Sequence, residues 1–309
     1  MQRLSHLLIS HISPLTSFTK IAWQTIRAKT LLVAFAVILL GQSLAWHDLQ
    51  YTQNQALDYF LASIILICCL FLQISVNLAN DYFDGLTGID TAARLGPKRA
   101  TQSGLIKPST MRYAIILTTS IACICGVYLI IKGGEVFFLL GLLSLFGVYA
   151  YSGGKKPLAS LGLGEVAVFL YFGYLAIMAS YVLQTEQFHV QLFMPATQVG
   201  LLIAAIMLIN NIRDIESDKA AGKYTLAVRI GDAYARKLYG IFMLTPFLLI
   251  PFDNYQPYVN FLLLPCALYL SIKIQQEKTQ GTLFNQYLGQ TSLLVFAWSV
   301  FYSLSLIDF

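Results

Sequence analysis

Two clusters of acidic side chains, far apart in the sequence, hold the residues best suited to chemistry. The first lies in NLANDYFDGLTGID, from Asn77 to Asp90, and the second in NNIRDIESD, from Asn210 to Asp218. Each cluster directly follows a long apolar run. Carboxylate and amide oxygens suit Mg²⁺, which proteins usually share between one or two carboxylates and a phosphate. The clusters therefore predict a Mg²⁺-assisted site for a phosphorylated ligand.

Spacing within the clusters supports this interpretation. Asn80 and Asp84 are four residues apart, as are Asp214 and Asp218, so each pair lies on one face of a helix. Each pair can present its oxygens to one ion. Two such half-sites facing each other would bind a diphosphate through bridging Mg²⁺. The alternative, ordinary solvated loop charges, does not account for the matched spacing.

Basic side chains follow the apolar runs and suit the same ligand. Arg99, Lys155 and Lys223 are placed to contact diphosphate oxygens, Arg through its two-pronged guanidinium and Lys as a point charge. Tyr151 precedes Lys155 across two glycines that let the backbone turn. The alternative role of each base is the charge bias that orients a membrane protein.

Composition identifies the class of protein that must position these residues. The chain has 309 residues, of which 57% are hydrophobic and 11% charged, with a mean hydropathy of +0.66. A soluble domain is about 25% charged. The sequence therefore predicts an all-α integral membrane protein in a lipid bilayer, and the net charge of +5 requires no nucleic acid partner.

Nine apolar runs are long enough to span a bilayer as helices. They lie near residues 30–46, 57–80, 112–131, 135–151, 162–184, 192–212, 237–252, 257–272 and 289–307. Threading them from a cytoplasmic N-terminus places all of the 20 Lys and Arg residues except Lys132 on the cytoplasmic side. The C-terminus is then external.

The chain, 1–309, is expected to form a single domain. Residues 1–25 form an interfacial segment, and residues 81–111 and 213–236 form cytoplasmic active-site loops. Asn80-x-x-x-Asp84 and Asn210-x-x-x-Asp214 share their spacing and follow spans two and six. This weak repeat predicts two four-helix units plus a ninth helix around a central cavity.

At these motifs the chain resembles the UbiA superfamily of intramembrane aromatic prenyltransferases. The resemblance rests on Asn80-x-x-x-Asp84, Tyr151-x-x-x-Lys155 and Asp214-x-x-x-Asp218 after spans two, four and six, and the nine-span count agrees along the chain. The phrases RLGPKRATQSGLI, LGLGE and NNIRDIESDKAAGKYTLAVRIG are similar to the 1,4-dihydroxy-2-naphthoate prenyltransferases of menaquinone synthesis.

The resemblance implies a polyprenyl diphosphate bound through Mg²⁺ at the four motif residues and a prenyl group transferred to 1,4-dihydroxy-2-naphthoate. Loss of diphosphate and CO₂ would give demethylmenaquinol in a bacterial cytoplasmic (inner) membrane. Asp81, with the motif acids, would act in catalysis by orienting a metal-bound water or a substrate hydroxyl. Arg27, Lys29 and Asn210 would meet the acceptor. Inward rings such as Tyr151, Tyr171 or Tyr174 would stabilise an allylic cation.

Two departures from the family pattern matter. The first motif often has a third acid four residues after the second, where this chain has Gly88 and then Asp90. This leaves open whether Asp90 reaches the metal. A Pro is common at the second place of the basic motif before span one, which here reads Arg27-Ala28-Lys29.

Other functions fit parts of the pattern. Within the enzyme class, 4-hydroxybenzoate, homogentisate or a haem could replace the naphthoate. A secondary transporter also has an internal repeat and intramembrane acids, but it predicts charges near the middle of the spans. Here the acids stand at the cytoplasmic ends, with Glu165 the nearest to an exception.

Overall fold

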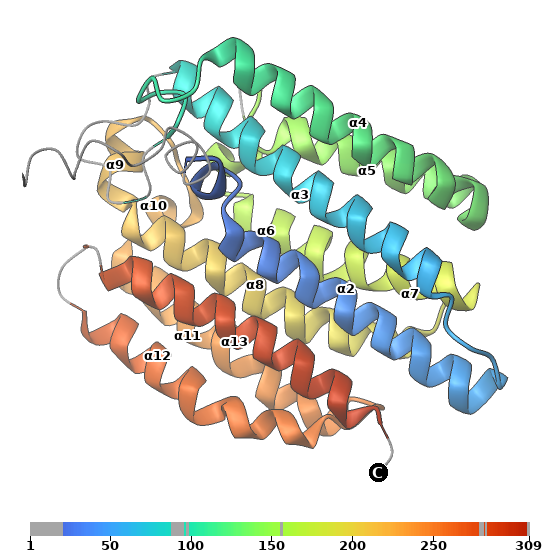
Figure 1. The fold of residues 1–309 in the computed structure, drawn as a ribbon. Coiled ribbons are helices and arrows are strands. Elements are labelled where there is room, and N and C mark those ends of the chain that lie inside the picture. The colour runs from blue at the N-terminus through green and yellow to red at the C-terminus, as the bar shows by residue number, and fades with distance from the viewer. Residues whose placement is uncertain are drawn as a thin grey trace, which may run out of the picture.

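The computed structural model describes residues 21–87, 96, 99–154, 157–277, 281 and 283–307, which form a bundle of helices without a β-strand (Figure 1). The long helices are α2 (Ala28–Asp48), α3 (Tyr59–Thr87), α4 (Pro108–Gly133), α5 (Glu135–Ala150), α8 (Phe193–Arg213), α11 (Asp232–Leu249), α12 (Leu264–Gln276) and α13 (Leu283–Ser305). One further continuous segment consists of α6 (Gly164–Val168), the π-helical η3 (Phe169–Ala176) and α7 (Ile177–Thr185). The short elements are η1 (Leu49–Gln53), η2 (Leu158–Leu161), η4 (Val190–Leu192), α9 (Ile215–Ala220), α10 (Leu226–Ile230), η5 (Ile250–Phe252) and η6 (Tyr258–Leu263).

The membrane character of the chain is confirmed. Seven helical segments within the described ranges are long and apolar enough to cross a membrane, and α5 is apolar but shorter. Large apolar side chains of α4, such as Ile124 and Ile131, are exposed, an arrangement that suits lipid contact and not water. All nine predicted spans lie over helices, but the count of nine crossings and the two four-helix units remain predictions.

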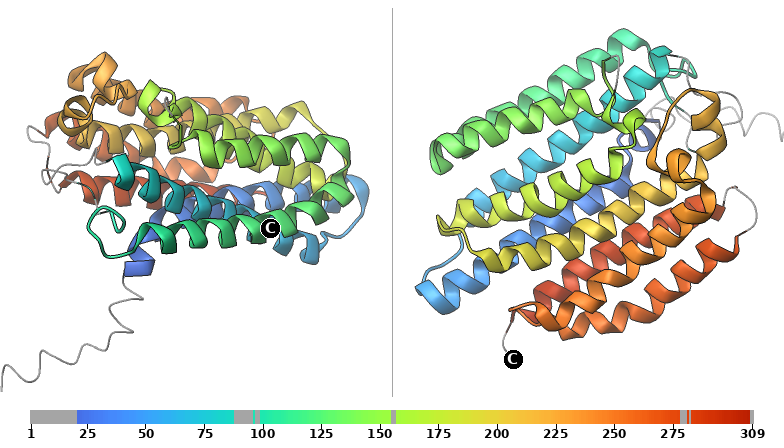
Figure 2. Two further views of the ribbon diagram at one scale, coloured as in Figure 1. Left: turned by 90° about the horizontal axis from the view of Figure 1, so that it is seen from above. Right: turned by 180° about the vertical axis from the view of Figure 1, so that it is seen from behind.

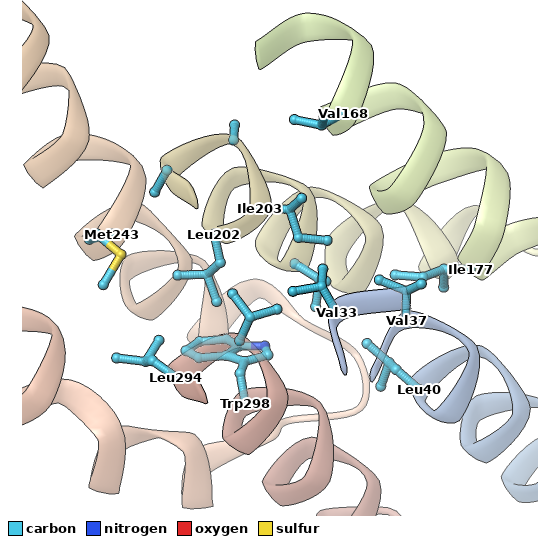
Figure 3. Packing of buried hydrophobic residues seen from close by; sticks show 14 of the residues in the cluster. Val33, Val37, Leu40, Val168, Ile177, Leu202, Ile203, Met243, Leu294 and Trp298 are labelled. Carbon is cyan, nitrogen blue, oxygen red and sulfur yellow. The ribbon is translucent and has the colours of Figure 1, made fainter. Parts of the chain in front are cut away.

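Helix α8 lies at the centre of the bundle. It packs against α6, η3, α11 and α13, and it is the most buried of the membrane-length segments. Figure 3 shows Leu202 and Ile203 of α8 close to Trp298 of α13 and Val33 of α2, all in one buried apolar cluster. This packing fixes the position of α8, whose C-terminal end carries the second acidic motif.

The segments that carry the two acidic motifs lie at the same end of the bundle. Figures 1 and 2 show α9 and α10 near the end of α3, with the C-terminal end of α13 at the opposite end. The predicted loop regions are partly helical: α3 continues through Thr87, and residues 213–236 contain α9, α10 and the first turn of α11. Helix ends thus present the acidic motifs, whereas Arg99 and Lys223 lie in the connections that follow them.

Candidate active site

The first acidic motif forms a buried polar cluster at the end of α3. Asn80 Nδ2 donates to Ser152 Oγ at 2.8 Å. Asn80 Oδ1 accepts from Arg27 Nη2 at 2.9 Å and also from Arg99 Nη1. The other terminal nitrogen of Arg99, Nη2, donates to Asp84 Oδ2. The predicted pair of Asn80 and Asp84 therefore lies on one helix face, where a single guanidinium joins the two side chains.

Lys223 connects the region of the second acidic motif to the first acidic motif. Its Nζ lies 3.3 Å from Asp84 Oδ2, although it belongs to the turn between α9 and α10. Gly222 makes this turn possible because it adopts φ +70°, which glycine reaches without strain. The Lys223 backbone N–H then donates to the Asp218 carbonyl at 2.8 Å. The ion pair joins the two motif regions, as the sequence predicted for a shared site.

Three bases lie around the oxygens of Asn80 and Asp84. Arg27 contacts Asn80, Arg99 contacts both Asn80 and Asp84, and Lys223 contacts Asp84. Buried charges are costly unless they are paired. The ion pairs of Asp84 with Arg99 and Lys223 meet this requirement at the end of α3.

Asp81 contacts the backbone of the segment that carries Arg99, and its predicted catalytic role stays a prediction. Its Oδ2 accepts from the backbone N–H of Ala100 and its Oδ1 from that of Thr101, both at 2.9 Å. These residues directly follow Arg99. Asp81 thus uses both carboxylate oxygens to hold the backbone that presents the Arg99 guanidinium.

The second motif carries its own arginine. Arg213 pairs with Asp214, at 2.5 Å between Nη2 and Oδ2 and 2.8 Å between Nε and Oδ1. Arg213 also donates to Asn210 Oδ1 at 2.9 Å and to Asn285 Oδ1 on α13 at 2.8 Å. Asp218 is half-buried on α9. Asn210 contacts Arg213, a site residue that sequence reasoning missed, and its predicted role toward the acceptor stays a prediction.

The predicted acceptor-binding bases separate. Arg27 reaches Asn80, whereas Lys29 is exposed and its Nζ lies beside Gly289 of α13. The structure therefore brings only Arg27 to the site described above. Lys155 and Asp90 lie outside the described residues, so their predicted roles stay predictions.

A large apolar cavity opens from the polar cluster. Its volume is about 460 Å³, and it runs between α2, α3, α4, α5, η3 and α8, with Arg27 and Asn80 in its wall. Tyr151 and Tyr171 also line it, and the Tyr151 hydroxyl donates to Met207 Sδ at 3.2 Å. The Tyr174 hydroxyl instead pairs with Thr197 Oγ1 at 2.6 Å.

The donor chemistry of the two motifs fits Mg²⁺. Among the residues placed by the structure, no group of three or more acidic, His or Cys side chains could cage a metal by itself. Mg²⁺ does not need such a cage, because it typically takes one or two carboxylates and fills its other positions with phosphate and water. The oxygens of Asn80, Asp84, Asp214 and Asp218 fit that pattern.

Buried bases and oxygen donors lie at the mouth of an apolar cavity within a bundle of membrane-length helices. The chain belongs to the UbiA prenyltransferase family, whose family profile matches residues 34–300.

Known proteins resemble the chain over most of its length. A 1,4-dihydroxy-2-naphthoate octaprenyltransferase of Escherichia coli (strain K12) is 38% identical, over 72% of this chain and 73% of its own. The protein of that name from Haemophilus influenzae is 36% identical, over 73% and 74% of the two chains. A UbiA homolog from Archaeoglobus fulgidus, solved with DMAPP and Mg²⁺, has the same fold, with a TM-score of 0.66, 16% identity and coverage of 90% of this chain and 97% of its own.

Proposed function

We propose that this protein transfers a polyprenyl group from a polyprenyl diphosphate to 1,4-dihydroxy-2-naphthoate in menaquinone (vitamin K2) biosynthesis. The observation that carries the proposal is the pairing of Asp84 with both Arg99 and Lys223 at the polar end of a long apolar cavity. An anionic head and an apolar tail in one ligand match these two surroundings. The relatives named above supply the identity of the acceptor.

In the reaction, the bond between the allylic carbon and the diphosphate oxygen breaks, and its electron pair leaves with the diphosphate. Arg27, Arg99 and Lys223 stabilise this developing charge because they are fixed before the substrate arrives. Asn80, Asp84, Asp214 and Asp218 would hold Mg²⁺, which supplies Lewis-acid stabilisation of the leaving group when bound. Asp81 acts as a positioning residue by fixing the backbone after Arg99.

The cavity protects the cation that remains. Its wall is mostly apolar, which excludes the water that would convert the cation to an alcohol. The rings of Tyr151 and Tyr171 line the same space and stabilise positive charge through their faces. The ring carbon of the acceptor that bears the carboxyl group attacks the allylic carbon. The C–C bond to the carboxylate then breaks, CO₂ leaves, and the bonding electron pair stays on that ring carbon, which restores the aromatic ring as demethylmenaquinol.

The location follows from the chemistry and the charge distribution. A polyprenyl tail enters the cavity from the bilayer, and the polar site faces the side where nearly all Lys and Arg residues lie. The proposal therefore places the protein in the bacterial cytoplasmic (inner) membrane. Its N-terminus and active site are cytoplasmic and its C-terminus is external.

Product analysis by mass spectrometry tests the proposal. Purified protein is incubated with a polyprenyl diphosphate and 1,4-dihydroxy-2-naphthoate, with Mg²⁺ and with a chelator. A Mg²⁺-dependent product that is prenylated and decarboxylated supports the function. Product from 4-hydroxybenzoate or homogentisate but none from the naphthoate would overturn the acceptor and keep the diphosphate site. No product from any acceptor would overturn the proposed prenyl transfer.

A further inference from the structure

Glu165 is a buried acid that the proposed reaction has not used. It lies in the first turn of α6 and is only 2% exposed. Its Oε1 accepts a hydrogen bond from Asn211 Nδ2 of α8 at 2.8 Å. Its Oε2 is buried and has no hydrogen-bond partner among the residues that the structure describes. A buried carboxyl oxygen without a partner costs free energy, so a ligand that supplies a donor would be favoured.

The carboxyl group stands next to the polar end of the cavity. Val168 and Met207 line the cavity, and they lie on the same helix faces as Glu165 and Asn211, because residues three or four apart on a helix are neighbours. α6 and α8 pack against each other (Figure 1), which brings these two faces together. Gly164, the residue before Glu165, lies beside the same lining residues: a Cβ added at Gly164 would be 3.6 Å from Met207 Cγ and 3.8 Å from the Tyr151 hydroxyl.

The two substrates differ in what they can offer to such an oxygen. A polyprenyl diphosphate has an anionic head and an otherwise apolar chain, so it carries no donor for Oε2. The carboxylate of the naphthoate is likewise an acceptor and carries no donor for Oε2. Of the two substrates, the naphthoate is the one with hydrogen-bond donors, and these are its ring hydroxyls.

We propose that Glu165 binds the aromatic acceptor. Its Oε2 accepts a hydrogen bond from a ring hydroxyl of the acceptor, and Asn211 holds the Glu165 carboxyl group in place. The ring then lies against Tyr151 and Met207, beside the space for the prenyl chain. This inference rests on the proposed function, because it assigns how that reaction recognises its acceptor. It makes Glu165 and Asn211 determinants of acceptor specificity.

Glu165→Gln tests the assignment. The Gln carbonyl can still accept from Asn211, but its amide then presents a donor where Oε2 stood. We expect KM for the naphthoate to rise about tenfold or more, while KM for the prenyl diphosphate stays within about twofold because no contact to the diphosphate site changes. Glu135→Gln is the matched control, since Glu135 is exposed at the other end of the bundle, in the first turn of α5. Its two KM values should equal those of the wild type.

Acceptor analogues provide a second measurement on the wild-type protein, which holds even if the Gln variant does not fold. Methylating the recognised hydroxyl at position 1 or 4 removes the donor, so one of the two methyl ethers should bind about tenfold or more weakly than the parent acid. Two ethers that both compete as well as the parent would overturn the inference. So would a Glu165→Gln variant with an unchanged naphthoate KM. Wild-type protein that makes no product from the naphthoate would instead overturn the proposed function, and this inference with it.

Discussion

Asp84 is the residue on which both halves of the site depend, since it accepts from Arg99 and Lys223 on different segments of the chain. Asp84→Asn keeps the size of the side chain but removes the charge that pairs these bases and serves as a metal ligand. We expect kcat/KM to fall about 100-fold or more, with the helical circular dichroism spectrum unchanged. Steady-state assays with a polyprenyl diphosphate and the naphthoate measure this loss.

A control on the same helix separates this effect from general damage. Asp58 Oδ1 accepts from the backbone N–H of Leu61 at the opposite end of α3. Asn supports a helix N-terminus as well as Asp does, so Asp58→Asn should leave kcat/KM unchanged. Near-normal turnover in Asp84→Asn would contradict the metal and diphosphate assignment of this residue.

Arg99 is the base whose geometry matters most, because its two prongs contact two different side chains, Asn80 and Asp84. A Lys ammonium carries the same charge but cannot make both contacts from one planar group. Arg99→Lys should therefore lower kcat/KM about tenfold or more, despite conserving charge. Turnover equal to that of the wild type would mean that only the charge of Arg99 matters.

At the residue scale, the sequence identified members of the site whose chemistry and spacing point to one ligand. Asn80, Asp84, Arg99 and Lys223 contact one another in the structure, and their metal and diphosphate roles stay predictions. Arg213 was missed because successive residues on a helix do not face each other. The chain leaves the helical conformation at Asp214, where φ is −102° and ψ is 10°, and this lets the two adjacent side chains pair.

At the scale of elements, small residues set how closely α8 approaches η3. A Cβ added at Gly173 would lie 2.7 Å from the Ala196 carbonyl oxygen and 2.8 Å from Gly200 Cα, both backbone atoms that cannot move aside cheaply. Membrane helices use such small residues to pack closely. Gly173→Ala should lower the free energy of unfolding by about 1–3 kcal/mol, seen as a lower thermal midpoint in detergent.

Gly126→Ala is the matched control for this packing argument. Its added Cβ would meet no atom within 4 Å on α4, and Ala favours a helix interior over Gly by up to about 1 kcal/mol. Its thermal midpoint should equal or exceed that of the wild type. If both variants lost stability equally, the close approach of α8 and η3 would not be the cause.

The positions of the long helices followed from hydropathy alone, because each apolar run must satisfy its own backbone hydrogen bonds in lipid. Their local departures from regular α-helical geometry did not follow from hydropathy. The π-helical turn in Phe169–Ala176 accompanies the close crossing at Gly173, which depends on a partner helix that the local sequence does not reveal. The short helices α9 and α10 were read as loops because elements of six and five residues are too short to show a helical period of apolar residues.

At the scale of the whole molecule, the end opposite the active site holds Asp253, a buried carboxyl group whose contribution to the free energy of unfolding varies with pH. Asp253 accepts from the Tyr302 hydroxyl at 2.8 Å and from the Tyr255 N–H at 3.1 Å. Burial raises the pKa of Asp253 above the usual value of a carboxyl group, and these hydrogen bonds only partly oppose that rise. The folded state therefore favours the protonated form.

The pH dependence of stability follows from that direction. Because the folded pKa of Asp253 exceeds the unfolded one, its contribution to stability is fully present below the unfolded pKa of about 3.9 and is lost as pH rises through the folded pKa. Asp253→Asn keeps a carbonyl for the Tyr255 N–H and cannot ionise. Its thermal midpoint relative to that of the wild type should therefore rise as pH increases from acidic to neutral. Parallel midpoint curves would contradict this expectation.

The orientation of the whole bundle can be tested separately from catalysis. All Lys and Arg residues except Lys132 fall on the predicted cytoplasmic side, and the C-terminal end of α13 lies at the end opposite α9 and α10 (Figure 1). Cells retain basic loops on the cytoplasmic side, so a reporter fused after Ile307 should be external. We expect an active alkaline phosphatase and a dark green fluorescent protein there. The same reporters after Gln276, at the end of α12 nearer the active site, should behave in the opposite way. A fluorescent fusion after Ile307 would place the acidic motifs on the outer face, away from a diphosphate made in the cytoplasm.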